Sequence, residues 1–182
     1  MPAFFLTFVA VAAAMLAGRD AHRVARLRVT LGWTGPLLVT GLLAALAGAG
    51  LAAWIARELA PLIPPSFKPF VVAVALGLAG LEVLLRTPPD NPREPTRSMG
   101  AITLVLLLGM VTDASGFIIL SMAIVTGEPL LAAAGGATGA LVVLSGAILA
   151  AEDWQMLPLK TLRRIVGTGL LFAAIVIALY AQ

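Results

Sequence analysis

Long apolar runs separated by short polar or proline-containing stretches make up most of the chain. A membrane-spanning helix needs about 20 mainly apolar residues. Six runs come close to this length or exceed it: 2–18, 33–57, 67–85, 98–126, 128–151 and 162–180. The first is only marginally long enough, and the others meet the requirement. The pattern predicts an all-α membrane protein with six transmembrane helices.

Composition strengthens this prediction. The chain is 60% hydrophobic and 12% charged, whereas a soluble domain carries about 25% charged residues. Since the apolar runs recur along the whole length, we expect an integral membrane protein and not a soluble domain with an anchor. The absence of cysteine excludes disulfides and thiolate metal sites. The basic residues lie mainly in connecting segments and form no basic patch of a soluble module, so we expect no nucleic-acid partner.

The residues that follow the first run, 19–28, are rich in arginine. Two interpretations remain open. The first helix ends at Gly18, and the basic segment lies at the membrane interface. Alternatively the helix continues to Arg28, with its arginines turned inward or snorkelling. In both cases we expect His22, the only histidine, to be interfacial.

The two halves of the chain resemble each other. A polar, proline-rich linker, 87–97, separates residues 1–86 from 98–182. When the first half is shifted by 94 residues without a gap, identical residue types coincide at corresponding positions: Gly41 with Gly135, Glu58 with Glu152 and Pro64 with Pro158. Because each half has three spans, the second half must be inverted relative to the first. Two inverted three-helix repeats are typical of secondary transporters, whose site lies where the repeats meet.

Charge predicts the orientation in the membrane. In the six-span arrangement, one side collects most basic residues: Arg19, Arg23, Arg26, Arg28, Arg86, Arg93, Arg97, Lys160, Arg163 and Arg164. The other side has only Arg57 and Lys68. By the positive-inside rule the first side is cytoplasmic. We therefore expect a bacterial-type inner (plasma) membrane protein with the linker 87–97 in the cytoplasm and both termini outside.

Three polar residues interrupt the run 98–126 near its middle: Thr112, Asp113 and Ser115. As one helix this run would be about 43 Å long, and a carboxylate inside it should face the bundle interior, a partner or a water-filled path. Two interpretations remain open for the three side chains. They line a transport path, or they form a structural ion pair and hydrogen bonds between helices.

The same 94-residue shift aligns LAGRDA, residues 16–21, with MVTDAS, residues 110–115. In this respect the chain resembles the Golgi and bacterial family of calcium/manganese cation–proton exchangers. Members of that family have two inverted three-helix repeats, each with E-x-G-D-[KR]-[ST] in its first helix. Asp113 and Ser115 match the second copy, and Gly18 matches the first.

The departures from the motif are specific. Met110 and Leu16 replace the two motif glutamates, and Arg19 replaces the first motif aspartate. The resemblance implies that Arg19 and Asp113 approach each other across the repeat axis and form a buried ion pair where the family holds its metal. Asp20 could supply a second carboxylate, but one helical step turns it about 100° away. We expect it to balance the charge of Arg23.

The resemblance implies a secondary transporter of small cations, similar to cation–proton exchangers, with a reduced acidic site. A single motif aspartate provides too few oxygen ligands for a divalent cation. The alternative is a family descendant that has lost transport and serves as a structural or partner-binding membrane protein. The expected partners are the lipid bilayer and small cations or protons, with no cofactor.

Other acidic residues have simpler interpretations. Glu58 and Glu152, at corresponding ends of spans two and five, suit a gate or entrance, but ordinary solvated helix ends explain them better, because charges at the interface cost little. We expect Glu82, four residues before Arg86, to pair with it at a helix end. An enzyme is not expected: the G-x-S-G pattern of an intramembrane serine protease is missing at Ser145.

Overall fold

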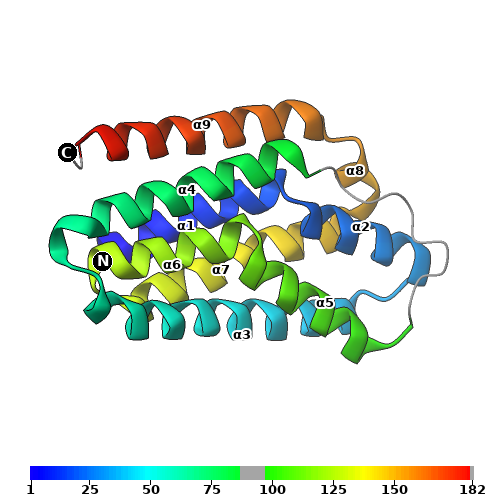
Figure 1. Cartoon of the computed structure of the whole chain (residues 1–182). Helices are drawn as coiled ribbons and strands as arrows, with labels where there is room; N and C mark the ends of the chain where they lie inside the picture. The colour runs from blue at the N-terminus through cyan, green and yellow to red at the C-terminus, as the bar shows by residue number, and fades with distance from the viewer. Residues whose placement is uncertain (87–96, 181–182) are drawn as a thin grey trace.

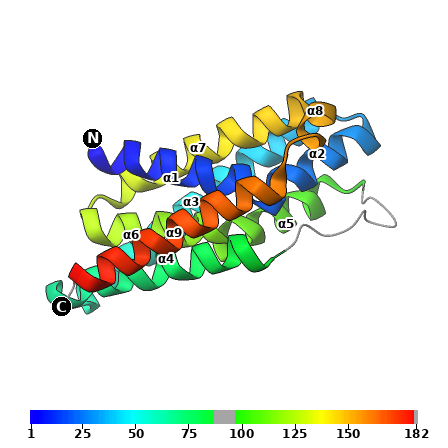
Figure 2. The ribbon, with the colours of Figure 1, turned by 90° about the horizontal axis from the view of Figure 1, so that it is seen from above.

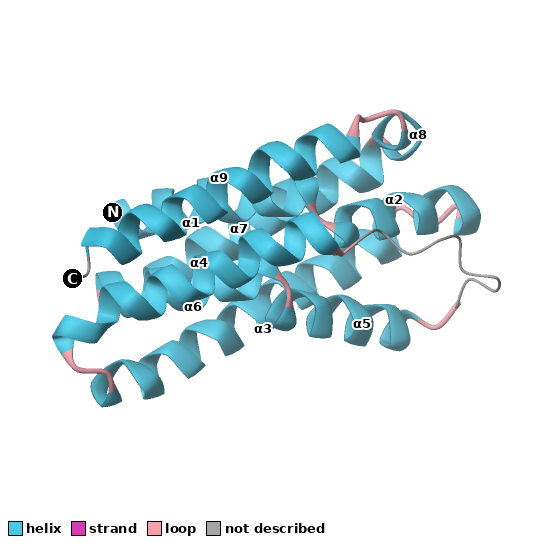
Figure 3. Ribbon diagram, turned by 45° about the horizontal axis from the view of Figure 1, so that its top comes forward, coloured by secondary structure: helices cyan, strands magenta, loops and turns pink. Residues whose placement is uncertain are grey.

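The computed structural model describes residues 1–86 and 97–180, and within these ranges all regular structure is helical (Figures 1 and 3). The helices are α1 (Pro2–Ala17), α2 (Arg19–Leu31), α3 (Gly35–Leu59), α4 (Lys68–Leu85), α5 (Met99–Thr112), α6 (Ala114–Thr126), α7 (Pro129–Leu149), α8 (Ala151–Gln155) and α9 (Leu159–Tyr180). Two short 3-10 helices, η1 (Ala60–Leu62) and η2 (Pro65–Phe67), connect α3 to α4. The predicted linker 87–97 lies outside the described residues except for Arg97.

Four stretches are long and apolar enough to cross a membrane on their own: Gly35–Leu62, Pro65–Leu85, Pro129–Leu149 and Leu159–Tyr180. Two more candidates consist of two helices joined at a sharp bend, 58° between α1 and α2 and 51° between α5 and α6. The described chain therefore has four to six candidate spans, which agrees with an integral membrane protein. The inverted relation of the two halves stays a prediction at this point.

The first bend lies at Gly18, whose extended backbone separates α1 from α2. A Cβ atom at Gly18 would lie 3.1 Å from the carbonyl oxygen of Ala14, so the bend suits a residue without a side chain. The first helix thus ends where the first interpretation of the sequence put its end. One face of α2 packs on α7 and α8, with Val24 and Ala25 fully buried. His22 is also buried within the protein, and its predicted position at the membrane interface stays a prediction.

The second bend corrects the prediction of one helix over 98–126. Asp113 has an extended backbone and lies between α5 and α6 as the N-cap residue of α6, a position that aspartate favours. The bend brings the first turn of α6 against the end of α5. A Cβ atom at Gly116 would lie 2.6 Å from the carbonyl oxygen of Met110, so only glycine fits there without a shift. The sequence is apolar on both sides of Asp113, and hydropathy alone gives no sign of the break.

Glycines bring the helices of the bundle into close contact. Gly135 and Gly139 of α7, one helical turn apart, lie against the α1 backbone at Phe4 and Phe8. A Cβ atom at Gly139 would lie 2.7 Å from the carbonyl oxygen of Phe8. Small residues at such spacing allow membrane helices to approach closely, and this contact fixes α1 against α7.

The last helix, α9, runs along α4 (Figures 1 and 2). Gly80 and Gly167 are apposed there, because a Cβ atom at Gly80 would lie 2.9 Å from the carbonyl oxygen of Gly167. The opposite face of α9 is exposed, with Phe172 69% and Leu179 66% accessible. In a membrane such a face contacts lipid or another helix.

Both ends of the described chain lie at one end of the bundle. The start of α1 and the end of α9 are at the left in Figure 1, whereas the end of α2, α8 and the start of α9 are at the right. The bends at Gly18 and Asp113 lie between these two ends. The two bends, and the polar residues next to them, therefore lie inside the bundle.

Gly135→Ala tests the contact between α1 and α7. The added methyl group meets the α1 backbone, so we expect it to lower the free energy of unfolding by about 1–3 kcal/mol. Gly50→Ala, in the middle of α3, is the control, because a Cβ atom there meets nothing within 4 Å. Unfolding of the purified protein in detergent measures both. Equal stability of the two variants would contradict the packing described here.

Candidate functional site

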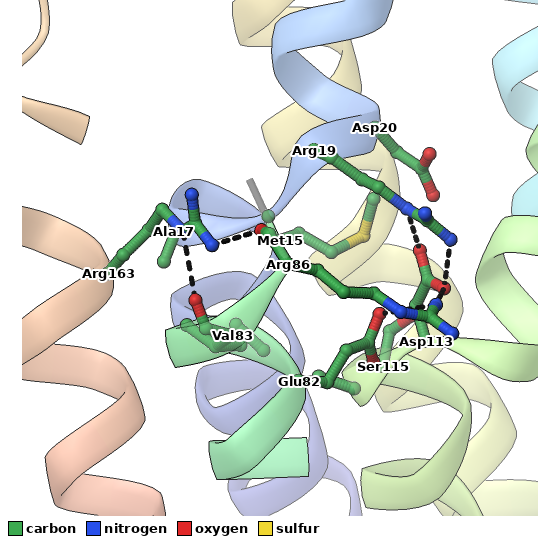
Figure 4. A pocket seen from close by; sticks show the side chains of 13 residues that line it. Met15, Ala17, Arg19, Asp20, Glu82, Val83, Arg86, Asp113, Ser115 and Arg163 are labelled. Atoms are coloured by element: carbon green, nitrogen blue, oxygen red, sulfur yellow. Dashed lines mark hydrogen bonds and ion pairs between the residues drawn. The ribbon is translucent and has the colours of Figure 1, made fainter. Parts of the chain in front are cut away.

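Charged side chains from both bends and from the end of α4 form one cluster (Figure 4). Arg19 and Asp20 belong to the first turn of α2, and Asp113 precedes α6. Glu82 lies in the last turn of α4, and Arg86 follows that helix. Both aspartates are thus near helix N-termini and Arg86 is at a helix C-terminus, the ends where the helix dipoles favour charges of these signs.

Arg19 and Asp113 form a two-pronged ion pair. The Nε atom of Arg19 donates to Oδ2 of Asp113 at 2.9 Å, and its Nη2 atom donates to Oδ1 at 2.6 Å. Parallel hydrogen bonds of this kind are the strongest arrangement of a guanidinium and a carboxylate. Asp113 is 8% exposed, so the pair is largely shielded. The predicted pairing is confirmed.

Arg86 links two carboxylates. Its Nη1 atom lies 3.3 Å from Oδ1 of Asp113 and 3.3 Å from Oε1 of Glu82. The predicted pairing of Glu82 with Arg86 is therefore confirmed, but Glu82 is more than a helix-end partner, since it shares this cation with Asp113. The second oxygen of Glu82, Oε2, is buried and has no hydrogen-bond partner among the described residues.

Asp20 lies beside the Arg19–Asp113 pair without joining it. Its Oδ1 atom accepts a hydrogen bond from Nη1 of Arg23 at 3.0 Å, as expected. Its Oδ2 atom lies against the α5 backbone, where a Cβ atom at Gly109 would come within 2.5 Å of it. The absence of a side chain at Gly109 thus makes room for a buried carboxylate.

The hydroxyl groups of Thr112 and Ser115 stabilise the second bend. Thr112 donates to the carbonyl oxygen of Leu108 at 2.8 Å, and its Oγ1 atom lies 3.4 Å from Oδ1 of Asp113. Ser115 donates to the carbonyl oxygen of Met110 at 3.3 Å. A helix end leaves carbonyl groups without a partner in the helix, and in an apolar environment each is costly. Ser115 lines the pocket and binds such a carbonyl group, that of Met110. Thr112 is exposed and does not line the pocket, and its bond to Leu108 lies within α5.

Arg163 of α9 caps the C-terminal end of α4. The side chain is buried, and its Nε atom donates to the carbonyl oxygen of Val83 at 2.9 Å. Its Nη2 atom donates to the carbonyl oxygen of Arg86. These are among the carbonyl groups that the end of α4 leaves without a helical partner. Arg163 thereby fixes the backbone that carries Glu82 and Arg86.

A small pocket lies between these groups. Its volume, about 30 Å³, gives room for one or two water molecules. Six ionisable side chains contribute to its wall, three guanidinium groups and three carboxyl groups: Arg19, Arg86, Arg163, Asp20, Glu82 and Asp113. With all six ionised, the charges balance. Within residues 1–86 and 97–180, no group of three or more histidine or acidic side chains is placed to hold a metal ion.

The suggested gate residues lie away from the pocket. Glu58, near the end of α3, and Glu152, in α8, are exposed, and neither lines the pocket. The two helix ends lie at opposite ends of the bundle (Figure 1). An entrance role for them stays a prediction.

Sequence reasoning missed the part that α4 and α9 play in the site. Glu82 gave a usable signal, since a carboxylate near the end of an apolar span is costly and has a reason to be there. Arg86 and Arg163 appeared only as markers of membrane orientation. No local pattern indicates that Arg163 contacts carbonyl groups some eighty residues earlier, because that contact depends on how α9 packs against α4.

Comparison with family models, with curated proteins and with solved structures finds no match to this chain.

Removal of one partner of the Arg19–Asp113 pair should strongly lower the free energy of unfolding. Arg19→Met leaves Asp113 with only the longer contact to Arg86, and we expect a loss of about 3–5 kcal/mol in the free energy of unfolding. Adding Asp113→Asn to this variant removes the uncompensated charge and should recover part of the loss, which a double-mutant cycle measures. Arg57→Met, at an exposed position of α3, is the control. An Arg19→Met variant as stable as the natural protein would contradict the pairing.

Arg163→Gln tests the cap on α4. The shorter, neutral side chain leaves backbone carbonyl groups unsatisfied, so we expect stability to fall by about 1–3 kcal/mol. Arg164→Gln is the matched control, because the neighbouring arginine is exposed. Amide hydrogen exchange at the end of α4 should also rise in Arg163→Gln alone. Equal exchange in both variants would show that the cap does not hold α4.

Proposed function

We propose that this protein is a secondary transporter of small monovalent cations coupled to protons, with its site at the Arg19–Asp113 pair. The observation that carries the proposal is the meeting of two broken helices at one charged pocket. Discontinuous helices of this kind form the substrate and ion sites of many secondary transporters. Ionisable residues at such a place are functional candidates because they are costly to maintain.

Inverted repeats form part of the proposal. Arg19 and Asp113 are 94 residues apart; Arg19 follows the break at Gly18, and Asp113 lies in the break of the second half. Helices α3 and α7 begin at Gly35 and Pro129, which have the same separation. The second helix of each broken pair ends at a left-handed glycine, Gly32 with φ 72° and Gly127 with φ 68°. The correspondence of breaks, helix starts and caps supports two copies of one three-helix unit.

The charge pattern favours a monovalent cation over a divalent one. Divalent cations such as Ca²⁺ take six to eight oxygen ligands, many of them carboxylate, whereas Asp113 already binds one arginine at both oxygens and a second at Oδ1. A single added charge can compete with one guanidinium for one carboxylate. Transport then requires that the Arg19–Asp113 pair opens on one side and closes again on the other.

The orientation follows from the distribution of basic residues. Arg23, Arg26 and Arg28 on α2 lie toward the same end of the bundle as Lys160 and Arg164 at the start of α9 (Figure 1). The positive-inside rule supports a cytoplasmic location for that end. Both termini then face outward, in a bacterial-type plasma membrane.

A second candidate function rests on the completeness of the ion pair. Because Arg19 already supplies a cation to Asp113 with two hydrogen bonds, the pair is also suited to lock the two broken helices together permanently. In this alternative the protein has lost transport and acts as a structural or partner-binding membrane protein. The exposed face of α9 is then the surface that an adjoining membrane helix would cover.

Flux in proteoliposomes tests the proposal. We expect Na⁺ or K⁺ flux driven by a proton gradient, at least tenfold lower in Asp113→Asn and close to the natural level in the control Asp153→Asn, an exposed acid of α8. Mn²⁺ and Ca²⁺ should give little or no flux. Absence of flux for every ion, from protein that remains folded, would favour the structural alternative.

A further inference from the structure

Glu82 has a feature that no other acidic residue of the described chain shares. Its Oε2 atom is buried and accepts no hydrogen bond, although its Oε1 atom lies 3.3 Å from Arg86. An ionised carboxylate with one oxygen buried and unpaired is unfavourable. A proton on Oε2 removes this cost, because the group then becomes a donor.

An acceptor for that donor is close. Glu82 and Asp113 share the Nη1 atom of Arg86 at equal distances of 3.3 Å, so the two carboxyl groups lie on the same guanidinium group. Figure 4 shows both carboxyl groups at the Arg86 guanidinium. Two carboxyl groups at such a separation favour sharing one proton, since their charges repel.

The other charged groups around Glu82 decide which carboxyl group takes the proton. Asp113 has both oxygens bonded to Arg19 of α2 and one also to Arg86, so both of its oxygens already accept hydrogen bonds from a positively charged donor. Arg163 of α9 is directed at backbone carbonyl groups, and Asp20 of α2 is paired with Arg23. Among the three carboxyl groups of the pocket, Glu82 therefore has the weakest interaction with a positively charged group. It is the group that gains most from a proton.

We infer that Glu82 carries the exchangeable proton of this site and that a monovalent cation replaces that proton between Glu82 and Asp113. This inference rests on the proposed transport function and names its coupling residue. In the exchange the O–H bond of Glu82 breaks, the proton leaves through the water-sized pocket, and the cation binds the carboxylate that remains. One positive charge enters as one leaves, so the site keeps its net charge.

The arrangement gives Arg19 and Arg86 separate roles. Arg19 holds both oxygens of Asp113, whereas Arg86 contacts both carboxyl groups and is 53% exposed at its side chain. When Glu82 loses its proton, Arg86 can turn toward it and release part of its hold on Asp113. The position of the exposed Arg86 guanidinium thus depends on whether Glu82 is protonated. The shielded Arg19–Asp113 pair stays closed until a cation binds.

Infrared difference spectroscopy of the purified full-length protein tests the assignment directly. The carbonyl stretching band of a protonated, shielded carboxyl group should be present at low pH and disappear as the pH rises. We expect this band to be lost in Glu82→Gln, to persist at a shifted frequency in Asp113→Asn, and to be unchanged in the exposed control Glu58→Gln. At fixed pH, Na⁺ or K⁺ should remove the band. Direct competition lowers the apparent proton affinity about tenfold for each tenfold rise in cation concentration.

The outcomes separate this inference from the transport proposal. A band that persists in Glu82→Gln and vanishes in Asp113→Asn would place the proton on Asp113 and overturn the inference. A natural protein with no such band at any pH would overturn it as well. If Glu82→Gln does not fold, Glu82→Asp replaces it, and a band that does not move in that variant counts against Glu82. If the band behaves as expected but no ion is transported, the proton assignment stands and the transport proposal fails.

Discussion

The structure depends on the pairing of one guanidinium with one carboxylate inside an apolar bundle. Either charge alone would be expensive to bury, and together they are tolerated because their geometry is good and Asp113 also contacts Arg86. Arg19 and Asp113 come from the two halves of the chain. Their pairing therefore requires both halves to expose a polar position at the same depth, and each half does so by interrupting a helix. The bends at Gly18 and Asp113 serve this one contact.

Helix ends explain why the cluster can hold so much charge. Helices α2 and α6 begin at it, with Asp20 and Asp113 near their N-termini, and α4 ends at it, with Arg86 at its C-terminus. The hydroxyl group of Ser115 and the guanidinium of Arg163 bind carbonyl groups that the ends of α5 and α4 would leave unpaired. Side chains next to the breaks thus offset the free-energy cost of breaking helices in an apolar environment, and the same side chains form or support the pocket wall.

The sequence was sufficient to predict the membrane character and the pairing of Arg19 with Asp113. The first follows from the length of the apolar runs, and the second was implied by the resemblance of residues 16–21 and 110–115 to the repeated exchanger motif. The bend at Asp113 could not be predicted in this way, because hydropathy is equally high on both sides of it. The place of Glu82 and Arg163 in the site depends on how α4 packs against α6 and α9, and tertiary packing has no signature in local sequence. The burial of His22 within the protein depends in the same way on tertiary packing, because α2 packs against α7 and α8.

The cap that Arg163 places on α4 has a consequence for how the protein is made. Arg163 belongs to the last helix of the described chain, while the carbonyl groups that it binds belong to the fourth helix. During synthesis, α4 must enter the membrane with its end uncapped and wait until most of the remaining chain has been added. The polar cluster is therefore completed late in biogenesis, after both bends have formed. An assembly intermediate without α9 would present an unfinished helix end and an unanchored Arg86, features by which quality-control proteases can distinguish it from the finished protein.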